Sequence, residues 1–227
     1  MSSIAQSLEK IRTRVTVLER CYERAPGDVS VLAVSKTKPP EAVREAAKAG
    51  QREFGENHVQ DALTKLDALQ GQDLIWHFIG PLQSNKTRVV AARFHWVHSI
   101  DRAKIARRLN EQRPEDLPPL EVCIQVNVSG EISKSGVEPH QVEELAAIVS
   151  ELPRLRLRGL MTLPRPCDTL EEQRRPFAAL RGIQEALNAG GLALDTLSMG
   201  MTNDMEAAIA EGATIIRIGT AIFGPRG

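Results

Sequence analysis

The sequence is poor in cysteine. It has three cysteines among 227 residues, at Cys21, Cys123 and Cys167. They are odd in number, far apart and without histidines at ligand spacing, which argues against a disulfide framework and against a zinc site. A reducing compartment fits this usage best.

An excess of charge of one sign is also missing. Lysine plus arginine and aspartate plus glutamate both number 29. Proteins that bind nucleic acid or an anionic membrane through their net charge carry an excess of basic residues. The composition therefore predicts neither partner, and any bound anion must be held by a local site.

Long apolar runs are the third absence. No run approaches the roughly 18 apolar residues of a membrane span, and residues 1–15 lack the apolar core of a secretory signal. We expect a cytoplasmic protein. With 42% apolar residues in 227, the chain can build one sizeable core and is near the usual length of a (β/α)8 barrel, although length alone also allows two small domains.

Strand-like segments alternate with helical ones along the whole chain. The strand-like segments are residues 29–36, 53–57, 74–79, 95–100, 120–128, 155–162, 194–199 and 214–218. Such alternation requires parallel strands with right-handed crossovers, and eight of them in this length predict a TIM barrel. The alternative, an open doubly wound sheet, predicts a glycine fingerprint after the first strand, and VSKTKPP has none.

An amphipathic helix precedes the first strand, because residues 3–24 carry apolar side chains at spacings of three and four. We expect residues 1–24 to pack on the barrel, so that residues 1–227 form a single domain. A coiled-coil seam for a partner is the other interpretation, although two and a half heptads are short for one. Asp101 is expected to cap a helix, and a later helix is expected to begin near Thr202 or Asn203.

The first strand ends in a lysine. In the segment VSVLAVSK, alternation places Leu32, Val34 and Lys36 on one face, so that an apolar row leads to an amine. The following Thr-Lys-Pro-Pro cannot continue a ladder and opens a helix. Schiff-base lysines of barrel enzymes lie at such strand ends; a solvated lysine at the start of a loop is the alternative.

Two later strand ends have the composition of an anion site. The run Ser198-Met199-Gly200-Met201-Thr202 leaves the seventh strand, and Gly219-Thr220 leaves the eighth. Hydroxyl groups, glycines that allow close backbone approach, and N–H groups at a helix start form a phosphate cradle, in the place where barrels commonly hold phosphate. A capped turn is the simpler alternative for the first of them.

Arg217 has the same parity as Ile215 and Gly219 and therefore points toward the barrel interior or its rim. A buried guanidinium needs an acceptor, for which Glu56 is a candidate. A lysine amine, a phosphate cradle and an arginine together suit pyridoxal 5′-phosphate; the lysine and cradle alone would suit a phosphosugar aldolase.

Seven sequence blocks decide between these two. They are VSKTKP (34–39), FGENHVQ (54–60), WHFIGPLQSNK (76–86), NVSGEISKSG (127–136), GLMTLP (159–164), LSMGMTNDMEAAI (197–209) and RIGTAIFG (217–224). In this collinear order they resemble the pyridoxal phosphate homeostasis protein family, and the resemblance spans nearly the whole chain. It implies a single barrel similar to the N-terminal domain of alanine racemase.

The resemblance also implies roles for individual residues. Lys36 would be the Schiff-base lysine that holds the cofactor as an aldimine, Asn57 would lie near the cofactor ring, and Arg217 would face the pyridine nitrogen. The phosphate would be surrounded by Ser198, Gly200, Thr202, Gly219 and Thr220. Two positions depart from the family: His58 stands where a tyrosine is usual, and Thr202 where a serine is usual, although threonine keeps the hydroxyl.

Members of this family are regarded as carriers or regulators of intracellular vitamin B6, and we therefore expect a monomer that binds the cofactor without efficient catalysis. An arginine at the ring nitrogen disfavours protonation there and weakens the ring as an electron sink. We expect the barrel to use all 227 residues, without the second domain that supplies the opposing acid/base group in alanine racemase, and such a loss typically costs about 10²–10⁴ in rate. Apo-enzymes that need the cofactor are the expected partners, and Lys38 and Lys134 are candidates to assist transfer.

Two other classes of function stay open. The same amine could serve a weak amino-acid racemase or a lysine-dependent aldolase, and the N-terminal helix could serve as an interaction module. The five histidines show no metal-ligand spacing, so we expect no metal site and assign His95 and His98 packing or surface roles.

Overall fold

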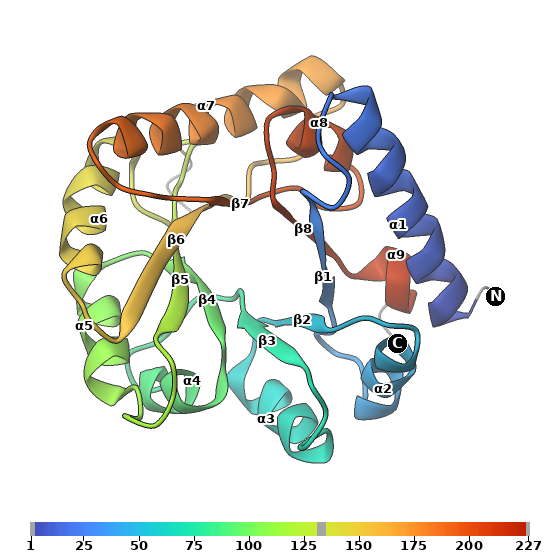
Figure 1. Ribbon diagram of the computed structural model, residues 1–227, viewed down its shortest axis with the longest axis horizontal. Helices are drawn as coiled ribbons and strands as arrows, with labels where there is room; N and C mark the ends of the chain where they lie inside the picture. Colours follow the sequence, from blue (N-terminus) through green and yellow to red (C-terminus); the bar gives the residue numbers. More distant parts are fainter. Residues whose placement is uncertain (1–2, 131–134, 226–227) are drawn as a thin grey trace.

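The computed structural model describes residues 3–130 and 135–225. Eight parallel strands close into a barrel in the order β1-β2-β3-β4-β5-β6-β7-β8, with helices between them (Figure 1). The strands are β1 (Ser30–Val34), β2 (Glu53–Glu56), β3 (Ile75–Phe78), β4 (Trp96–Ile100), β5 (Leu120–Gln125), β6 (Leu155–Met161), β7 (Thr196–Ser198) and β8 (Ile215–Ile218). The predicted TIM barrel is confirmed.

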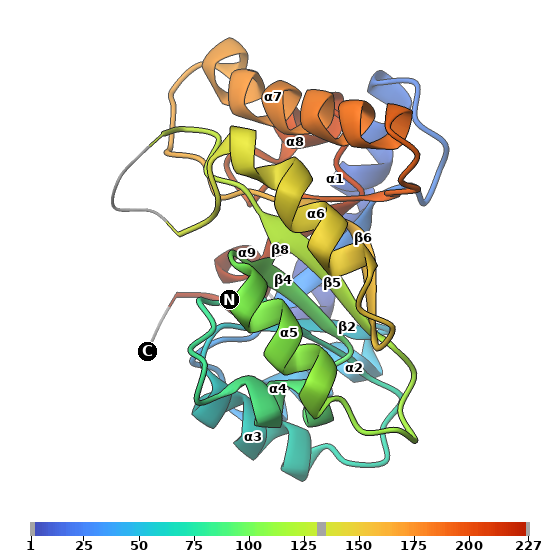
Figure 2. The ribbon, with the colours of Figure 1, turned by 90° about the vertical axis from the view of Figure 1, so that its left-hand side faces the viewer.

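Helices surround the strands on the outside of the barrel. They are α1 (Ile4–Cys21), α2 (Pro40–Lys48), α3 (Val59–Ala68), α4 (Thr87–Arg93), α5 (Ala103–Gln112), α6 (Val142–Ser150), α7 (Leu170–Ala189), α8 (Met205–Ala210) and α9 (Thr220–Phe223), with a 3₁₀ turn at Pro139–Gln141. Seen from the side, α5 and α6 lie over strands β4 to β6 (Figure 2). One cluster of buried apolar side chains joins strand residues such as Phe54 and Ile124 to helix residues such as Val43 and Leu109.

Closure depends on the pairing of the first strand with the last. Ser30 pairs with Ile215 and Leu32 with Arg217, so β1 lies between β2 and β8. The carboxyl ends of all eight strands consequently meet at one rim, as in other barrels of this type. The pairing brings the segment after β1 beside the segment after β8.

Helix α1 is the expected N-terminal helix. Its first turn has a reciprocal capping box between Ser3 and Gln6, and its apolar face is buried against the rest of the chain, beside α2 and α9 (Figure 1). Glu19 on the same helix is buried and accepts the amides of Gly27 and Val29. These bonds tie the helix to the loop that leads into β1.

Three local predictions are wrong. The first strand ends at Val34 and not at Lys36, because Thr37 adopts a left-handed φ of 65° that no strand can contain. Asp101 is not an N-cap: its carboxylate binds the Arg102 side chain, and Arg102 itself precedes α5. Helix α8 begins at Met205 and not near Thr202, after a turn in which the Met201 amide donates to Asp204.

Candidate functional site

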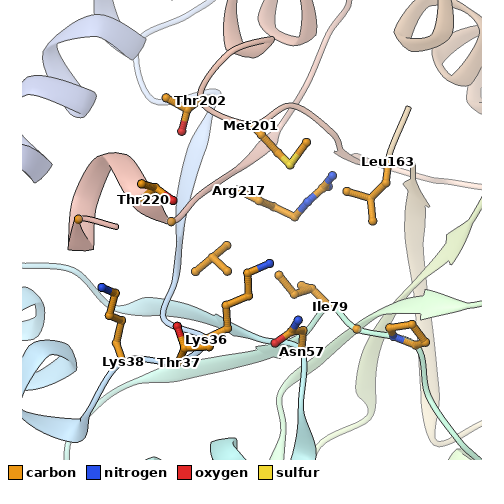
Figure 3. A pocket seen from close by; sticks show the side chains of 15 residues that line it. Lys36, Thr37, Lys38, Asn57, Ile79, Leu163, Met201, Thr202, Arg217 and Thr220 are labelled. Carbon is orange, nitrogen blue, oxygen red and sulfur yellow. The ribbon is translucent and has the colours of Figure 1, made fainter. Parts of the chain in front are cut away.

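Lys36 lies in the turn that joins β1 to α2. The Ser35 amide still donates to the carbonyl of Gly55 on β2, at 3.0 Å, so the chain leaves the sheet directly before the lysine. Thr37 then turns the backbone, and its amide donates to Oδ2 of Asp61 at 3.1 Å. This geometry directs the Lys36 side chain into a cavity at the rim (Figure 3).

The cavity has a volume of about 310 Å³, within the range of small-molecule sites, which starts at about 300 Å³. Six of the eight predicted site residues line it: Lys36, Asn57, Thr202, Arg217, Gly219 and Thr220. The wall also contains residues to which no site role was predicted, namely Val34, Thr37, Ile79, Gly80, Pro81, Leu163, Met201 and Gly224. Ile79 directly follows β3 and Pro81 lies two residues further on, so their place after a strand end was a usable signal.

A buried ion pair lies directly behind the Lys36 turn. Nζ of Lys65 on α3 is 2.7 Å from Oε1 of Glu56 on β2 and 2.7 Å from the carbonyl oxygen of Ser35. The same ammonium group is 3.0 Å from Oδ2 of Asp61, the carboxylate that accepts the amide after Lys36. Burial raises the pKa of Glu56, and the Lys65 cation and the bonds from Lys65 and Ser35 act against this rise.

Arg217 is buried at the end of β8, and three of its five N–H groups make hydrogen bonds inside the barrel. Nη1 donates to the carbonyl and to the hydroxyl of Ser198, at 2.5 and 2.8 Å, and Nη2 donates to the carbonyl of Thr162 at 2.8 Å. Burial lowers the pKa of Arg217 to about 10. The acceptor suggested from the sequence, Glu56, pairs with Lys65 instead.

Ser198 and Gly200 are the two predicted site residues that do not line the cavity. The Ser198 hydroxyl lies behind Arg217 and contacts Nδ1 of His98 at 2.7 Å. Gly200 has a φ of 92°, and a Cβ there would lie 2.4 Å from the Cβ of Ala208. Its carbonyl accepts the main-chain amide of Arg217 at 2.9 Å, so Ser198 holds the guanidinium and Gly200 holds the backbone of the same residue.

The opposite wall carries two hydroxyl groups. Within the described residues, the side chains of Thr202 and Thr220 make no hydrogen bond to the protein. Gly219 lies beside them, with its Cα so near the neighbouring strand that a Cβ would be 3.3 Å from the carbonyl of Val34. Figure 3 shows both threonines across the cavity from Lys36 and Asn57.

Asn57 brings an unsatisfied acceptor to the cavity. Its Oδ1 is buried and has no hydrogen-bond partner in the described part of the chain. Gly80, after β3, allows the backbones to approach closely, because a Cβ there would lie 2.2 Å from the carbonyl oxygen of Asn57. The neighbouring His58 is exposed and does not line the cavity, so the family's tyrosine position lies outside this wall.

Of the two lysines suggested for transfer, Lys38 is in the described part of the chain and lies beside the cavity. Nζ of Lys38 donates to the carbonyl of Pro225 at 2.6 Å and lies at the cavity edge. Lys134 lies outside the described residues. A second hollow of about 640 Å³ shares Met201, Thr202 and Thr220 with the first and extends past Cys167, so the cavity is open toward the loop after β6.

Among residues 3–130 and 135–225, no three His, Cys, Asp or Glu side chains form a group that could hold a metal ion. Over the same ranges no helix has both the length and the apolar character needed to cross a membrane.

Residues 6–227 match the family model described as the alanine racemase N-terminal domain. A pyridoxal phosphate homeostasis protein of Pseudomonas aeruginosa is 57% identical over 226 residues, covering 100% of this chain and 97% of that protein. The structure of PipY from Synechococcus elongatus with PLP bound has a TM-score of 0.85 and 37% identity, covering 98% of this chain and 100% of that one.

A more distant likeness concerns the fold alone. Alanine racemase from Corynebacterium glutamicum superposes with a TM-score of 0.72 at 18% identity, covering 95% of this chain and 60% of that chain. The barrel therefore has the same fold as one part of that longer chain.

Proposed function

The chain belongs to the alanine racemase N-terminal domain family and, within it, to the pyridoxal phosphate homeostasis proteins, and from this premise we propose that it binds pyridoxal 5′-phosphate and carries it in the cell without efficient catalysis. The observation that carries this proposal is the position of one amine. The Lys36 side chain enters a cavity whose opposite wall offers two threonine hydroxyls and a buried arginine (Figure 3).

The residues present fit this cofactor in three ways. Thr202 and Thr220 offer hydroxyl groups that make no bond to the described protein and can donate to a phosphate, and the backbone of Gly219 lines the cavity beside them. The orphaned Oδ1 of Asn57 needs a donor on a bound molecule. Ser198 and Gly200 would act on the site through Arg217, which we place at the ring nitrogen.

Lys36 would hold the cofactor covalently. Bound pyridoxal phosphate supplies an electrophilic aldehyde, and attack by the lysine amine forms a C=N bond with release of one water. The turn and the buried Lys65 pair fix the backbone on both sides of this residue. The amine is therefore presented from a rigid position, which lowers the entropic cost of binding.

Efficient catalysis would need a second proton-transfer group opposite the lysine. In the described part of the chain, the residues that line the cavity include no Asp, Glu, His, Cys or Tyr, and the second amine, Lys38, lies at the cavity edge and donates to the carbonyl of Pro225. The lack of such a group typically costs about 10²–10⁴ in rate. Arg217 keeps a fixed positive charge where a ring nitrogen would accept a proton, which disfavours carbanion chemistry.

The test is a visible absorption spectrum after mixing the protein with pyridoxal phosphate. We expect a visible band that borohydride bleaches, with the reduced adduct located on Lys36 by peptide mass spectrometry. Lys36→Ala should lose the band and its matched control Lys38→Ala should keep it. A wild-type protein that stays colourless would contradict the proposal.

Turnover assays distinguish a cofactor carrier from an amino-acid racemase and from a phosphosugar aldolase. We expect no racemisation of L- or D-alanine above the rate with free cofactor. Measurable racemisation would favour the racemase, and borohydride trapping that requires a phosphosugar would favour the aldolase.

We also propose that residues 1–227 form one domain and act as a monomer that delivers the cofactor to apo-enzymes. Light scattering tests the monomer. Cofactor transfer can be measured as the rate at which an apo-enzyme gains activity. Lys38 or Lys134 assists the transfer if alanine at that position slows this activation.

A further inference from the structure

A chain of polar contacts crosses the barrel from the cavity to the opposite mouth. Nη1 of Arg217 donates to the Ser198 hydroxyl at 2.8 Å, and that hydroxyl is 2.7 Å from Nδ1 of His98. Nε2 of His98 is 2.9 Å from Nδ1 of His77, whose own Nε2 is 3.7 Å from Oε2 of Glu53. These five residues belong to β8, β7, β4, β3 and β2.

This series of polar contacts runs through the interior of the barrel. Strands β4 and β7 are not neighbours in the closed sheet, so the side chains of His98 and Ser198 can meet only across its centre. Ser198 and His98 are fully buried, and His77 and Arg217 are nearly so. Because these side chains are almost without solvent exposure, their polar atoms depend on one another for hydrogen bonds.

Donor and acceptor roles along the chain follow from Arg217, which can only donate. The Ser198 oxygen accepts from Arg217, and within the described residues its only other partner is His98. The hydroxyl hydrogen is therefore satisfied only if it points to Nδ1 of His98, which leaves the His98 hydrogen on Nε2. That hydrogen is donated to Nδ1 of His77, so His77 also carries its hydrogen on Nε2.

The far end supports the same direction. Nε2 of His77 is buried, lacks a hydrogen-bond partner in the described part of the chain and faces the Glu53 carboxylate. An N–H group there attracts the carboxylate, whereas a bare lone pair would repel it. Both residues line a polar hollow of about 510 Å³ at the amino-terminal mouth, together with Trp96 and Arg158.

The two histidine rings are held by packing. The His77 ring stacks on Trp96 with a centroid distance of 5.4 Å and an angle of 7°, and the Arg158 guanidinium lies over the same Trp96 ring, 5.1 Å from its centroid. Burial and the Arg217 charge lower the pKa of His98 to about 3, and burial also lowers that of His77. Both are neutral at physiological pH, as a directed chain of this kind requires.

We propose that His98 and His77 are positioning residues that fix the orientation of Arg217 through the Ser198 hydroxyl and link it to Glu53 at the opposite mouth of the barrel. That Arg217 in turn faces the cofactor ring rests on the function proposed above. The series of contacts from Arg217 to Glu53 does not itself depend on any bound molecule.

The first test uses the protein without cofactor. NMR of ¹⁵N-histidine-labelled protein should show His98 and His77 as neutral rings with hydrogen on Nε2. A hydrogen on Nδ1 of His98 would overturn the proposal. Exchange of the Arg217 side-chain N–H groups with solvent should be slow in the wild type and at least about tenfold faster in His98→Phe, because one of the bonds that hold Nη1 loses its fixed partner.

The second test adds the cofactor. His98→Phe should bind pyridoxal phosphate about 3- to 10-fold more weakly, the effect of one hydrogen bond, and should shift the pH at which the visible band changes. His98→Asn keeps an acceptor near Nδ1 and should restore most of the affinity, and the exposed His140→Asn is the matched control. Wild-type affinity and spectrum in a folded His98→Phe would overturn the proposal.

Failure of the proposed function is distinguishable from failure of this inference. If the wild type binds no pyridoxal phosphate, the proposed function fails. The histidine tautomers and the Arg217 exchange rates still show whether His98 and His77 hold Arg217 in place. If His98→Phe does not fold, Ser198→Ala breaks the same chain, and unchanged Arg217 exchange in that variant counts against the inference.

Discussion

Lys65 and Glu56 form a fully buried ion pair, and the ammonium group of that lysine also binds the carbonyl oxygen of the residue that precedes Lys36. The pair thus connects α3 and β2 to the turn that carries the reactive amine. A lysine with 1% of its side chain exposed is unusual in a helix on the outside of a barrel. Here the ammonium group is buried because its partners, the Glu56 carboxylate and the Ser35 carbonyl, lie inside the protein.

Removing the Lys65 charge should lower the free energy of unfolding. Lys65→Met keeps most of the volume but leaves Glu56 buried without a cation, which costs about 3–5 kcal/mol. Urea unfolding followed by circular dichroism measures the loss. The exposed Lys48→Met on α2 should change stability by less than about 0.5 kcal/mol. Equal effects of the two substitutions would show that the buried pair has no special weight.

Stability should fall as the pH is lowered from about 6.5 toward 4. His98 has a pKa of about 3 in the folded protein and an ordinary value of 6.5, and the pKa of His77 is also lowered. The unfolded chain therefore binds more protons in this range, and each histidine costs about 1.4 kcal/mol per pH unit. Glu53 and Glu56 have raised pKa values and act in the opposite direction.

A comparison of variants isolates the histidine effect from that of the carboxylates. The stability of His98→Asn should fall less steeply with decreasing pH than that of the wild type, by about 1.4 kcal/mol per pH unit. Urea midpoints at several pH values provide this difference. Parallel curves for the two proteins would mean that His98 is not held neutral in the folded state.

The barrel and the position of Lys36 could be predicted because they depend on local patterns. Alternation within single strands identifies the eight segments, and the proline pair after Lys38 marks the end of the first. Parity along β8 correctly placed Arg217 facing inward. Each of these conclusions uses only residues close together in the chain.

The partners of the buried polar groups could not be predicted, because they depend on register between distant strands. Arg217 binds main-chain carbonyls of Ser198 and Thr162, and no side-chain pattern marks a carbonyl. The sequence pattern of α3 does not distinguish Lys65 from a solvent-exposed lysine on an amphipathic helix. His98 contacts Ser198, 100 positions away in the sequence, and a shift of one residue in either strand would separate them.

Gly80→Ala should weaken cofactor binding by displacing Asn57. The new Cβ would lie 2.2 Å from the carbonyl oxygen of Asn57, and a main-chain atom cannot move aside as a flexible side chain does. Overpacking of this kind costs about 1–3 kcal/mol. Titration with pyridoxal phosphate and thermal unfolding should both show the loss. Gly182→Ala on α7, where a Cβ meets nothing within 4 Å, is the control, and an affinity equal to that control would contradict the expectation.

Loss of the Thr202 or Thr220 hydroxyl should weaken binding of the cofactor phosphate. Each hydroxyl lines the cavity and makes no bond to the described protein, so it is available to a charged acceptor, and such a bond contributes about 1.5–3 kcal/mol. Thr202→Val and Thr220→Val keep the shape and should each raise the Kd for pyridoxal phosphate by roughly 10- to 150-fold.

Comparison with pyridoxal shows whether the phosphate is the group concerned. This aldehyde lacks the phosphate, so its affinity should be nearly the same in the wild type and in both valine variants. Thr13→Val on the exposed side of α1 controls for the substitution itself. If the variants lose pyridoxal as strongly as pyridoxal phosphate, the threonines shape the cavity as a whole, and the phosphate must be held elsewhere.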